Sequence, residues 1–244
     1  KPEGAGFAAG RELLLSSATD TYFRPVDVAM GVDGAMYVAD WYDQAVGGHA
    51  FNDPNRGRIY VVRKTGATKK PAMPLPYKTN ADVVVALKSD NVDAQFQARQ
   101  RLLESGEAAL PALAEMANHE DYLIVARALW LADRIGGDGR KLVLDALRDD
   151  DPAMRALAVR ILRGHDAEYE KQILALADDP SLQVRREVML AIRDIESDEA
   201  DRTLIKLARQ WDGNDRWYLE TIGIAARGKA GQANQRFDRY AGYE

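Results

Sequence analysis

The residues best suited to chemistry lie in the first quarter of the chain, and His49 is the first of them. It stands in a glycine-rich loop directly after Gly47 and Gly48. A histidine there could act as a general base or as a metal ligand, because its charge changes near neutral pH. The competing interpretation is a loop histidine satisfied by backbone groups. His119 and His165 lie at the boundaries of repeats described below and are expected to be structural.

Aspartates next to a predicted strand end form a candidate calcium site. Asp40 and Asp43 flank a Trp-Tyr pair, and Asp53 follows in the same loop. Carboxylate oxygens are the hard ligands that calcium prefers. However, this spacing matches no calcium-loop signature, and aspartates at strand ends commonly cap turns. Both interpretations stay open.

Three arginines and one tryptophan in the same region could bind a substrate or cofactor. Arg24 precedes a proline, and Arg56 and Arg58 bracket a glycine. An arginine can hold a carboxylate through paired hydrogen bonds. The alternative is that these arginines tie a loop to the strands. Trp41 could stack on a sugar ring, or it could simply pack at a strand end.

Arg127, Arg155 and Arg185 stand in the second part of the chain and could look like an anion-binding ladder. The structural interpretation is that each pairs with acidic residues such as Asp151 or Asp179 at neighbouring helix starts. Exposed pairs of that kind contribute little individually. Arg185 and the adjacent Arg186 could also line a groove.

Composition excludes several classes of site. The chain has no cysteine, which removes disulfides, thiolate nucleophiles, thiolate-bound zinc and attached c-type haem. Its net charge is −5, which argues against a nucleic-acid partner. The acidity belongs to residues 80–244, because residues 1–79 carry ten Lys and Arg against eight Asp and Glu. No apolar run is long enough to span a membrane. The start at Lys1, without a signal segment, indicates a processed or truncated end.

Residues 1–63 read as a small β segment. After an irregular lead-in over residues 1–10, strands are expected at Leu13–Leu15, 25–30, 35–39 and 57–63. Asp33 and Gly34 supply a hairpin turn, because Asp-Gly readily takes the positive φ that such turns need. Four strands are the number expected of one propeller blade.

A proline-rich linker over residues 64–79 separates this segment from a helical array. Apolar residues then recur at the helical period. The pattern predicts helices at 80–88, 91–104, 107–118, 121–135, 139–148, 152–163, 168–177, 181–194, 199–210 and 215–227. The last pair is stretched, with Trp211 and Trp217 flanking its turn, and residues 227–244 read as an end cap or a partly disordered tail.

A second period of thirty residues decides the fold. It relates Ala98, Ala128, Ala158 and Val188, as well as Leu102, Ala132, Leu162 and Ile192. Such self-similarity predicts stacked helical hairpins, about five of them. The openings DDPAMR at 150–155 and DDPSLQVR at 178–185 place a capping aspartate before a first-turn proline. This part, residues 80–244, resembles the HEAT-repeat family, which implies an α-solenoid that binds proteins along its concave face.

The β segment carries a different resemblance. Its runs FRPVD at 23–27, DGAMYVADWY at 33–42, GGH at 47–49 and GRIY at 57–60 follow one another. This order resembles the last blade of the "membrane-bound dehydrogenase" proteins of planctomycetes, which are similar to glucose/sorbosone dehydrogenase propellers. In that family HEAT repeats follow the propeller, often with a haem-binding cytochrome c module. No C-x-x-C-H motif is present here, and neither are the earlier blades.

The resemblance implies a periplasmic or secreted oxidoreductase acting on sugars or polyols, with a quinone and calcium over the central channel. One blade could supply only part of that site, and the remaining blades would come from the same or another chain. The first hypothesis is therefore the C-terminal portion of a dehydrogenase-like propeller protein, with the HEAT array as a docking arm. The second is a non-enzymatic HEAT scaffold with a β appendage. A native chain much longer than this one would favour the first.

Overall fold

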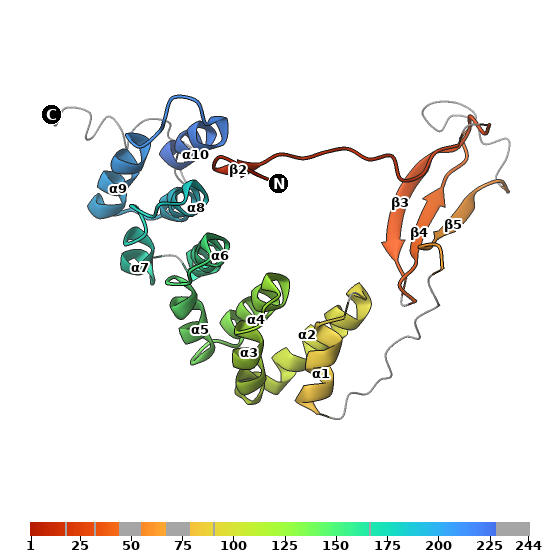
Figure 1. The fold of residues 1–244 in the computed structure, drawn as a ribbon, viewed down its shortest axis with the longest axis horizontal. Helices are drawn as coiled ribbons and strands as arrows, with labels where there is room; N and C mark the ends of the chain where they lie inside the picture. The colour runs from red at the N-terminus through yellow and green to blue at the C-terminus, as the bar shows by residue number, and fades with distance from the viewer. Residues whose placement is uncertain are drawn as a thin grey trace. The chain divides into compact units, whose positions relative to one another are not determined.

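The computed structural model describes residues 1–17, 19–31, 33–43, 55–66, 79–89, 91–165 and 167–227. The chain divides into two compact units, one of Lys1–Gly10 and Leu113–Glu244 and the other of Arg11–Ala112. Most of the structure is helical, with two small antiparallel sheets (Figure 1). The long loop at 44–54, most of the expected linker (67–78) and the tail after residue 227 lie outside the described residues.

The larger sheet belongs to the unit Arg11–Ala112 and has three antiparallel strands, ordered β3 (Pro25–Met30), β4 (Met36–Asp40) and β5 (Arg58–Val62). The expected Asp-Gly turn joins β3 to β4. Gly34 has a φ of +73°, and the Gly31 N–H donates to the Ala35 carbonyl at 2.8 Å. A left-handed φ costs glycine nothing, which explains why this turn could be predicted.

The fourth expected strand, at Leu13–Leu15, is not formed. These residues have no strand conformation, and Leu13 and Leu14 are 82% and 70% exposed. Three successive leucines carry no alternation, so the run specifies a strand only where a neighbouring edge supplies hydrogen bonds. Within the described residues the sheet therefore has three strands rather than the four of a complete blade.

Residues 1–10 were expected to be irregular, and that expectation is wrong. Strands β1 (Pro2–Glu3) and β2 (Gly6–Phe7) pair as a short antiparallel hairpin. Gly4 has a φ of +54°, which allows the tight turn, and Ala5 at its tip is fully buried. An isolated two-stranded hairpin is marginal in water, so the burial of its tip must stabilise it.

The expected helices form, with ends that lie within three residues of the prediction. Two short 3₁₀ turns, at Gly106–Ala109 and Arg163–His165, join helices. Helices α4, α6, α8 and α10 lie in one layer, and α5, α7 and α9 in the other (Figure 1). None of the described helices is both long and apolar enough to cross a membrane. Their bounds are α1 (Asn80–Leu87), α2 (Val92–Ser105), α3 (Leu110–Ala117), α4 (Tyr122–Ile135), α5 (Gly139–Ala146), α6 (Pro152–Leu162), α7 (Glu170–Leu174), α8 (Leu182–Ile192), α9 (Asp198–Ala208) and α10 (Arg216–Arg227).

A hydrogen-bonded turn recurs every thirty residues before a helix. A side chain accepts the backbone N–H two residues later: Ser89 from Asn91, His119 from Asp121, Asp149 from Asp151 and Asp179 from Ser181, at 2.8–3.1 Å. In three of the four repeats the residue that donates this N–H then caps the helix with its own side chain. Asp151, for example, accepts the Ala153 N–H at 2.8 Å. This turn explains the sequence period, because it satisfies backbone donors that a helix start leaves unpaired. It also gives His119 the structural role expected of it.

The two thirty-residue ladders lie in the core. Each member is fully buried, with no exposed surface, and the members are Ala98, Ala128, Ala158, Val188, Leu102, Ala132, Leu162 and Ile192. The first ladder consists of small or β-branched residues, which let neighbouring helices approach closely. The periodicity therefore predicted the core correctly.

An ion pair joins two successive repeats. The Arg155 guanidinium donates to both carboxylate oxygens of Asp179 at 2.7 and 2.9 Å, and it also reaches the Asp149 and Asp150 carbonyls. The structural interpretation of Arg155 is thereby confirmed. Arg185 instead donates to the Asp179 carbonyl at 2.7 Å. The pairing expected for Arg127, half-buried on α4, stays a prediction.

Replacing Arg155 by alanine is expected to lower the free energy of unfolding by about 2–4 kcal/mol, because the nearly buried Asp179 carboxylate would lose its partner. Urea unfolding followed by circular dichroism measures this change. Arg202→Ala is the control, since that arginine is exposed on α9. Equal losses in the two variants would contradict the structural role of the pair.

The same pair predicts a dependence on pH. Burial raises the pKa of Asp179, but the Arg155 guanidinium and the Ser181 N–H outweigh it and hold that pKa below its ordinary value. A pKa lowered by folding means that the pair contributes its full stability above the ordinary aspartate value and loses it as pH falls through the folded value. Unfolding midpoints measured from pH 7 down to pH 3 should therefore converge for the native chain and Arg155→Ala.

Candidate functional site

Asp40, a proposed calcium ligand, lies buried at the end of β4 with both carboxylate oxygens occupied. Oδ1 accepts the backbone N–H groups of Arg24 at 2.8 Å and Tyr42 at 3.0 Å. Oδ2 accepts Nε of Arg58 at 3.0 Å and lies 2.7 Å from its Nη2. Burial raises the pKa of Asp40, but these donors together hold it below its ordinary value. A carboxylate used in this way fixes the turn after β4.

Arg58 is the centre of this cluster. Its guanidinium pairs with Asp20 at 2.7 Å as well as with Asp40. It also lies over two aromatic rings, 4.9 Å from the centroid of Tyr42 and 5.4 Å from that of Tyr60. Stacking and paired hydrogen bonds suit the planar guanidinium group. The geometry therefore matches the alternative in which Arg58 ties a loop to the strands.

The other proposed binding residues are Arg24, Arg56 and Trp41. Arg24 turns back and donates to the Thr21 and Phe23 carbonyls at 2.8 and 2.9 Å. Arg56 donates to the Tyr42 hydroxyl at 3.2 Å, and Trp41 is 57% exposed. Their roles toward a substrate or a cofactor stay predictions.

The second proposed calcium ligand, Asp43, is also buried. Asp43 is 8% exposed, and its backbone N–H donates to the Tyr22 carbonyl at 3.1 Å. Among the described residues no three His, Asp or Glu side chains gather as a metal would require. His49 and Asp53 lie outside the described residues, so their proposed roles stay predictions.

Sequence reasoning missed Asp20 and Tyr42. Asp20 lies 38 residues before Arg58, the arginine it pairs with. Tyr42 has a φ of +53°, unusual for a residue other than glycine. The strained backbone places its ring against Tyr22, with 5.7 Å between centroids. Neither role has a local signal, because both depend on contacts between separate segments.

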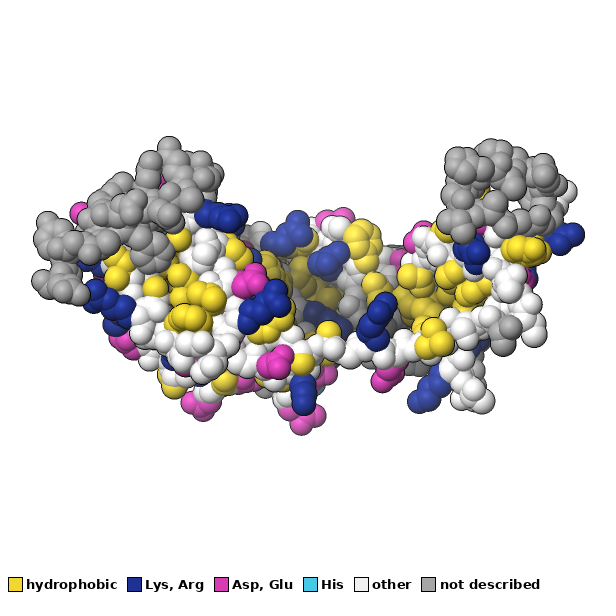
Figure 2. Space-filling model, turned by 90° about the horizontal axis from the view of Figure 1, so that it is seen from above, with side chains coloured by type: hydrophobic (Ala, Val, Ile, Leu, Met, Phe, Trp, Pro, Cys, Tyr) yellow, Lys and Arg dark blue, Asp and Glu magenta, His cyan; other side chains and the backbone are white. Residues whose placement is uncertain are grey.

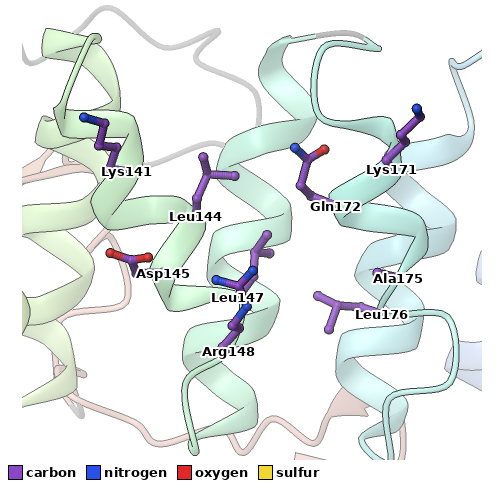
Figure 3. Close-up of a pocket in the computed structure, with 9 residues that line it drawn as sticks. All are labelled: Lys141, Leu144, Asp145, Leu147, Arg148, Lys171, Gln172, Ala175 and Leu176. Carbon is purple, nitrogen blue, oxygen red and sulfur yellow. The ribbon is translucent and has the colours of Figure 1, made fainter.

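A second candidate site is a groove of about 660 Å³ between α5 and α7. Leu144, Leu147 and Leu176 project into the gap between the two segments, and Lys141 and Lys171 lie at one end (Figure 3). Asp145, Arg148, Gln172 and Ala175 complete the lining. The groove thus combines an apolar floor with a mainly cationic rim.

The charges on the rim differ in how far they are neutralised. Lys141 pairs with the exposed Asp138 at 2.7 Å, and this hydrogen bond raises the pKa of Lys141. Arg148 and Lys171 have no ion-pair partner within the described part of the chain, and both are exposed. These two cations can therefore meet an acidic ligand without first breaking an existing pair.

Comparison with protein families separates the two regions. Residues 1–68 match DUF7133, a domain family of unknown function, and residues 140–221 match the HEAT repeats. A comparison with curated proteins gave no match. The groove between α5 and α7 lies within the matched HEAT repeats, which suggest a protein-interaction scaffold.

Replacing Asp40 by asparagine tests the cluster at the sheet end. The amide keeps the shape but cannot accept from all four donors, so we expect a loss of about 1–3 kcal/mol in local stability. Hydrogen exchange of the Arg24 and Tyr42 amides measures it. Asp27→Asn is the matched control, because that exposed aspartate accepts only the N–H of the next residue among the described contacts. A calcium-dependent rise in melting temperature that Asp40→Asn abolishes would instead support the metal-ligand interpretation.

Proposed function

We propose that this chain is a protein-interaction scaffold whose HEAT repeats bind an acidic, amphipathic segment of a partner protein. The observation that carries this proposal is the groove between α5 and α7, with leucines on its floor and cations on its rim. Solenoid repeats serve as binding surfaces because each unit adds a similar strip of surface to the next.

The floor supplies the affinity in this proposal. Leu144 and Leu176 are only half-buried, so an apolar side chain placed between them would remove apolar surface from water. Such burial contributes roughly 25 cal/mol per Å². A groove of about 660 Å³ accommodates a few side chains, which suits one face of a helix or a short extended segment rather than a whole domain.

The rim supplies orientation. The helical part of the chain is acidic, with 23 Lys and Arg against 30 Asp and Glu over residues 80–244. Arg148 and Lys171 are therefore a local positive region on an acidic background. An acidic segment is attracted to this region and repelled elsewhere, which favours one register. Binding along the concave face, expected from the HEAT resemblance, stays a separate prediction.

Charge reversal tests this site. The probe is a fluorescent amphipathic peptide that alternates leucine and glutamate at helical spacing. Arg148→Glu/Lys171→Glu is expected to weaken its binding by about tenfold or more, and added salt should weaken binding to the native chain. The control, Arg202→Glu/Arg209→Glu, makes the same change in charge on and just after α9. If both double variants bind the peptide equally, the groove is not its site.

We also propose that the three-stranded sheet is one part of a larger β assembly, as the resemblance to a propeller blade implies. The supporting observation is exposed apolar surface on both faces of the sheet. Val28 and Met30 on one face are 58% and 50% exposed, and Ile59 and Val61 on the other are 72% and 49% exposed. Yellow side chains on the sheet are open to solvent in Figure 2. Apolar sheet faces are stabilised by packing against another sheet, and further blades of the same or another chain would provide one.

The oxidoreductase activity, the quinone and calcium cofactors and the periplasmic or secreted location rest on that resemblance and stay predictions. The blade proposal has its own test, which is the sequence encoded upstream of Lys1 in the natural gene. Further strand–Asp-Gly–strand segments there are expected, together with a natural protein mass well above that of this chain. If the upstream sequence lacks such segments, the blade proposal fails and the scaffold proposal is unaffected.

A further inference from the structure

The tip of the N-terminal hairpin is buried among helices that follow it by about 180 to 220 residues. Ala5 has no exposed surface and belongs to the same core cluster as Met189 of α8 and Tyr218 and Ala225 of α10. Lys1–Gly10 accordingly forms one compact unit with the later helices. Figure 1 shows β2 next to α8 and α10.

Both backbone groups of Ala5 are hydrogen-bonded by charged side chains. Its N–H donates to Oδ2 of Asp215 at 2.6 Å, and its carbonyl accepts from Nη1 of Arg186 at 3.2 Å. The other oxygen of Asp215 accepts the Tyr218 N–H at 3.0 Å, which caps α10. One carboxylate therefore fixes the helix start and the hairpin together, through hydrogen bonds strengthened by its charge.

The residues on either side of Ala5 must be glycine. A Cβ on Gly4 would lie 2.2 Å from Oδ2 of Asp215, and Gly4 also has a positive φ. A Cβ on Gly6 would lie 2.4 Å from Cγ of the Trp217 ring. The close approach of the backbone to these two side chains thus selects a Gly-x-Gly turn with a small middle residue.

The helical side of this contact is held in place independently of the hairpin. Trp211 Nε1 donates to the Asp215 carbonyl at 3.0 Å, and Asp212 accepts the Asp215 N–H at 2.8 Å. The Tyr218 hydroxyl donates to the Leu207 carbonyl at 3.0 Å. Because these bonds fix Asp215 from within the helical part, the site is organised before a turn binds.

We propose that Arg186, Asp215 and Trp217 form a turn-recognition site, whose ligand is the Gly4-Ala5-Gly6 turn of this chain. Through this site the first residues of the DUF7133 match bind the last of the HEAT repeats. The hairpin serves as a cap for the final helices, which terminal repeats require.

Gly6→Ala in the full chain tests this site, and Gly10→Ala is the matched control because a Cβ on Gly10 meets nothing within 4 Å. We expect Gly6→Ala to speed hydrogen exchange by about tenfold or more at residues 2–7 and in the first turn of α10, since the tip would lose its hydrogen bonds. The control should match the native chain. Unchanged exchange in Gly6→Ala would overturn the proposal.

A peptide added in trans separates recognition from a general loss of folding. A synthetic peptide of residues 1–10 should restore slow exchange at the start of α10 in the Gly6→Ala chain, whereas the same peptide with alanine at position 6 should not. Adding Arg186→Ala to the Gly6→Ala chain should reduce the effect of the peptide, because the Ala5 carbonyl of the peptide would lose its donor. If the native-sequence peptide gives no protection, or both peptides give the same protection, the turn is not specifically recognised.

Discussion

The structure depends on one repeated turn, in which a polar side chain accepts the backbone N–H two residues later. The turn satisfies donors that the following helix cannot, and it therefore fixes where α2, α4, α6 and α8 begin. In three of the four repeats a longer side chain six residues after the turn's first residue then reaches back to the turn carbonyl, as Gln95 does to Ser89 and Arg185 does to Asp179. Once the start and direction of each helix are fixed, the thirty-residue ladders lie on the buried face of the helices. The accepting residues of the four turns are Ser89, His119, Asp149 and Asp179.

This local origin explains why the helical part could be predicted from sequence and the hairpin at the N-terminus could not. The turn, the cap and the ladder are all encoded within one repeat, so periodicity and the Asp-Pro openings were sufficient. The hairpin at residues 1–10 is stabilised by side chains about 180 to 210 residues away, and no local sequence pattern predicts these contacts. Leu13–Leu15 shows the converse, because a run with apparent strand propensity stays exposed where no described strand pairs with it.

The candidate site at the sheet end shows the limit of residue types as a guide. Asp40 was selected as a candidate calcium ligand and Arg58 as a candidate binding residue, and in the structure both form hydrogen bonds within the fold. Asp20 and Tyr42 decide that outcome, and they became visible only with the three-dimensional contacts. The groove between α5 and α7 was not visible in sequence either, because its leucines follow the ordinary helical period and their exposure depends on the spacing between helices.

The last repeat departs from the rule that the others follow, and the departure has a consequence. Its turn begins at Asp212, 33 residues after Asp179 rather than thirty, with Gly213 at a φ of +85° within it. Because of this shift, Asp215 lies at the start of α10. In the earlier repeats the capping aspartates bond to their own helix, whereas Asp215 uses its second oxygen for Ala5. In the regular repeats, turn, cap and buried ladder agree, and the structure follows from these local rules. In the last repeat the longer spacing leaves one oxygen of Asp215 for the backbone of Ala5.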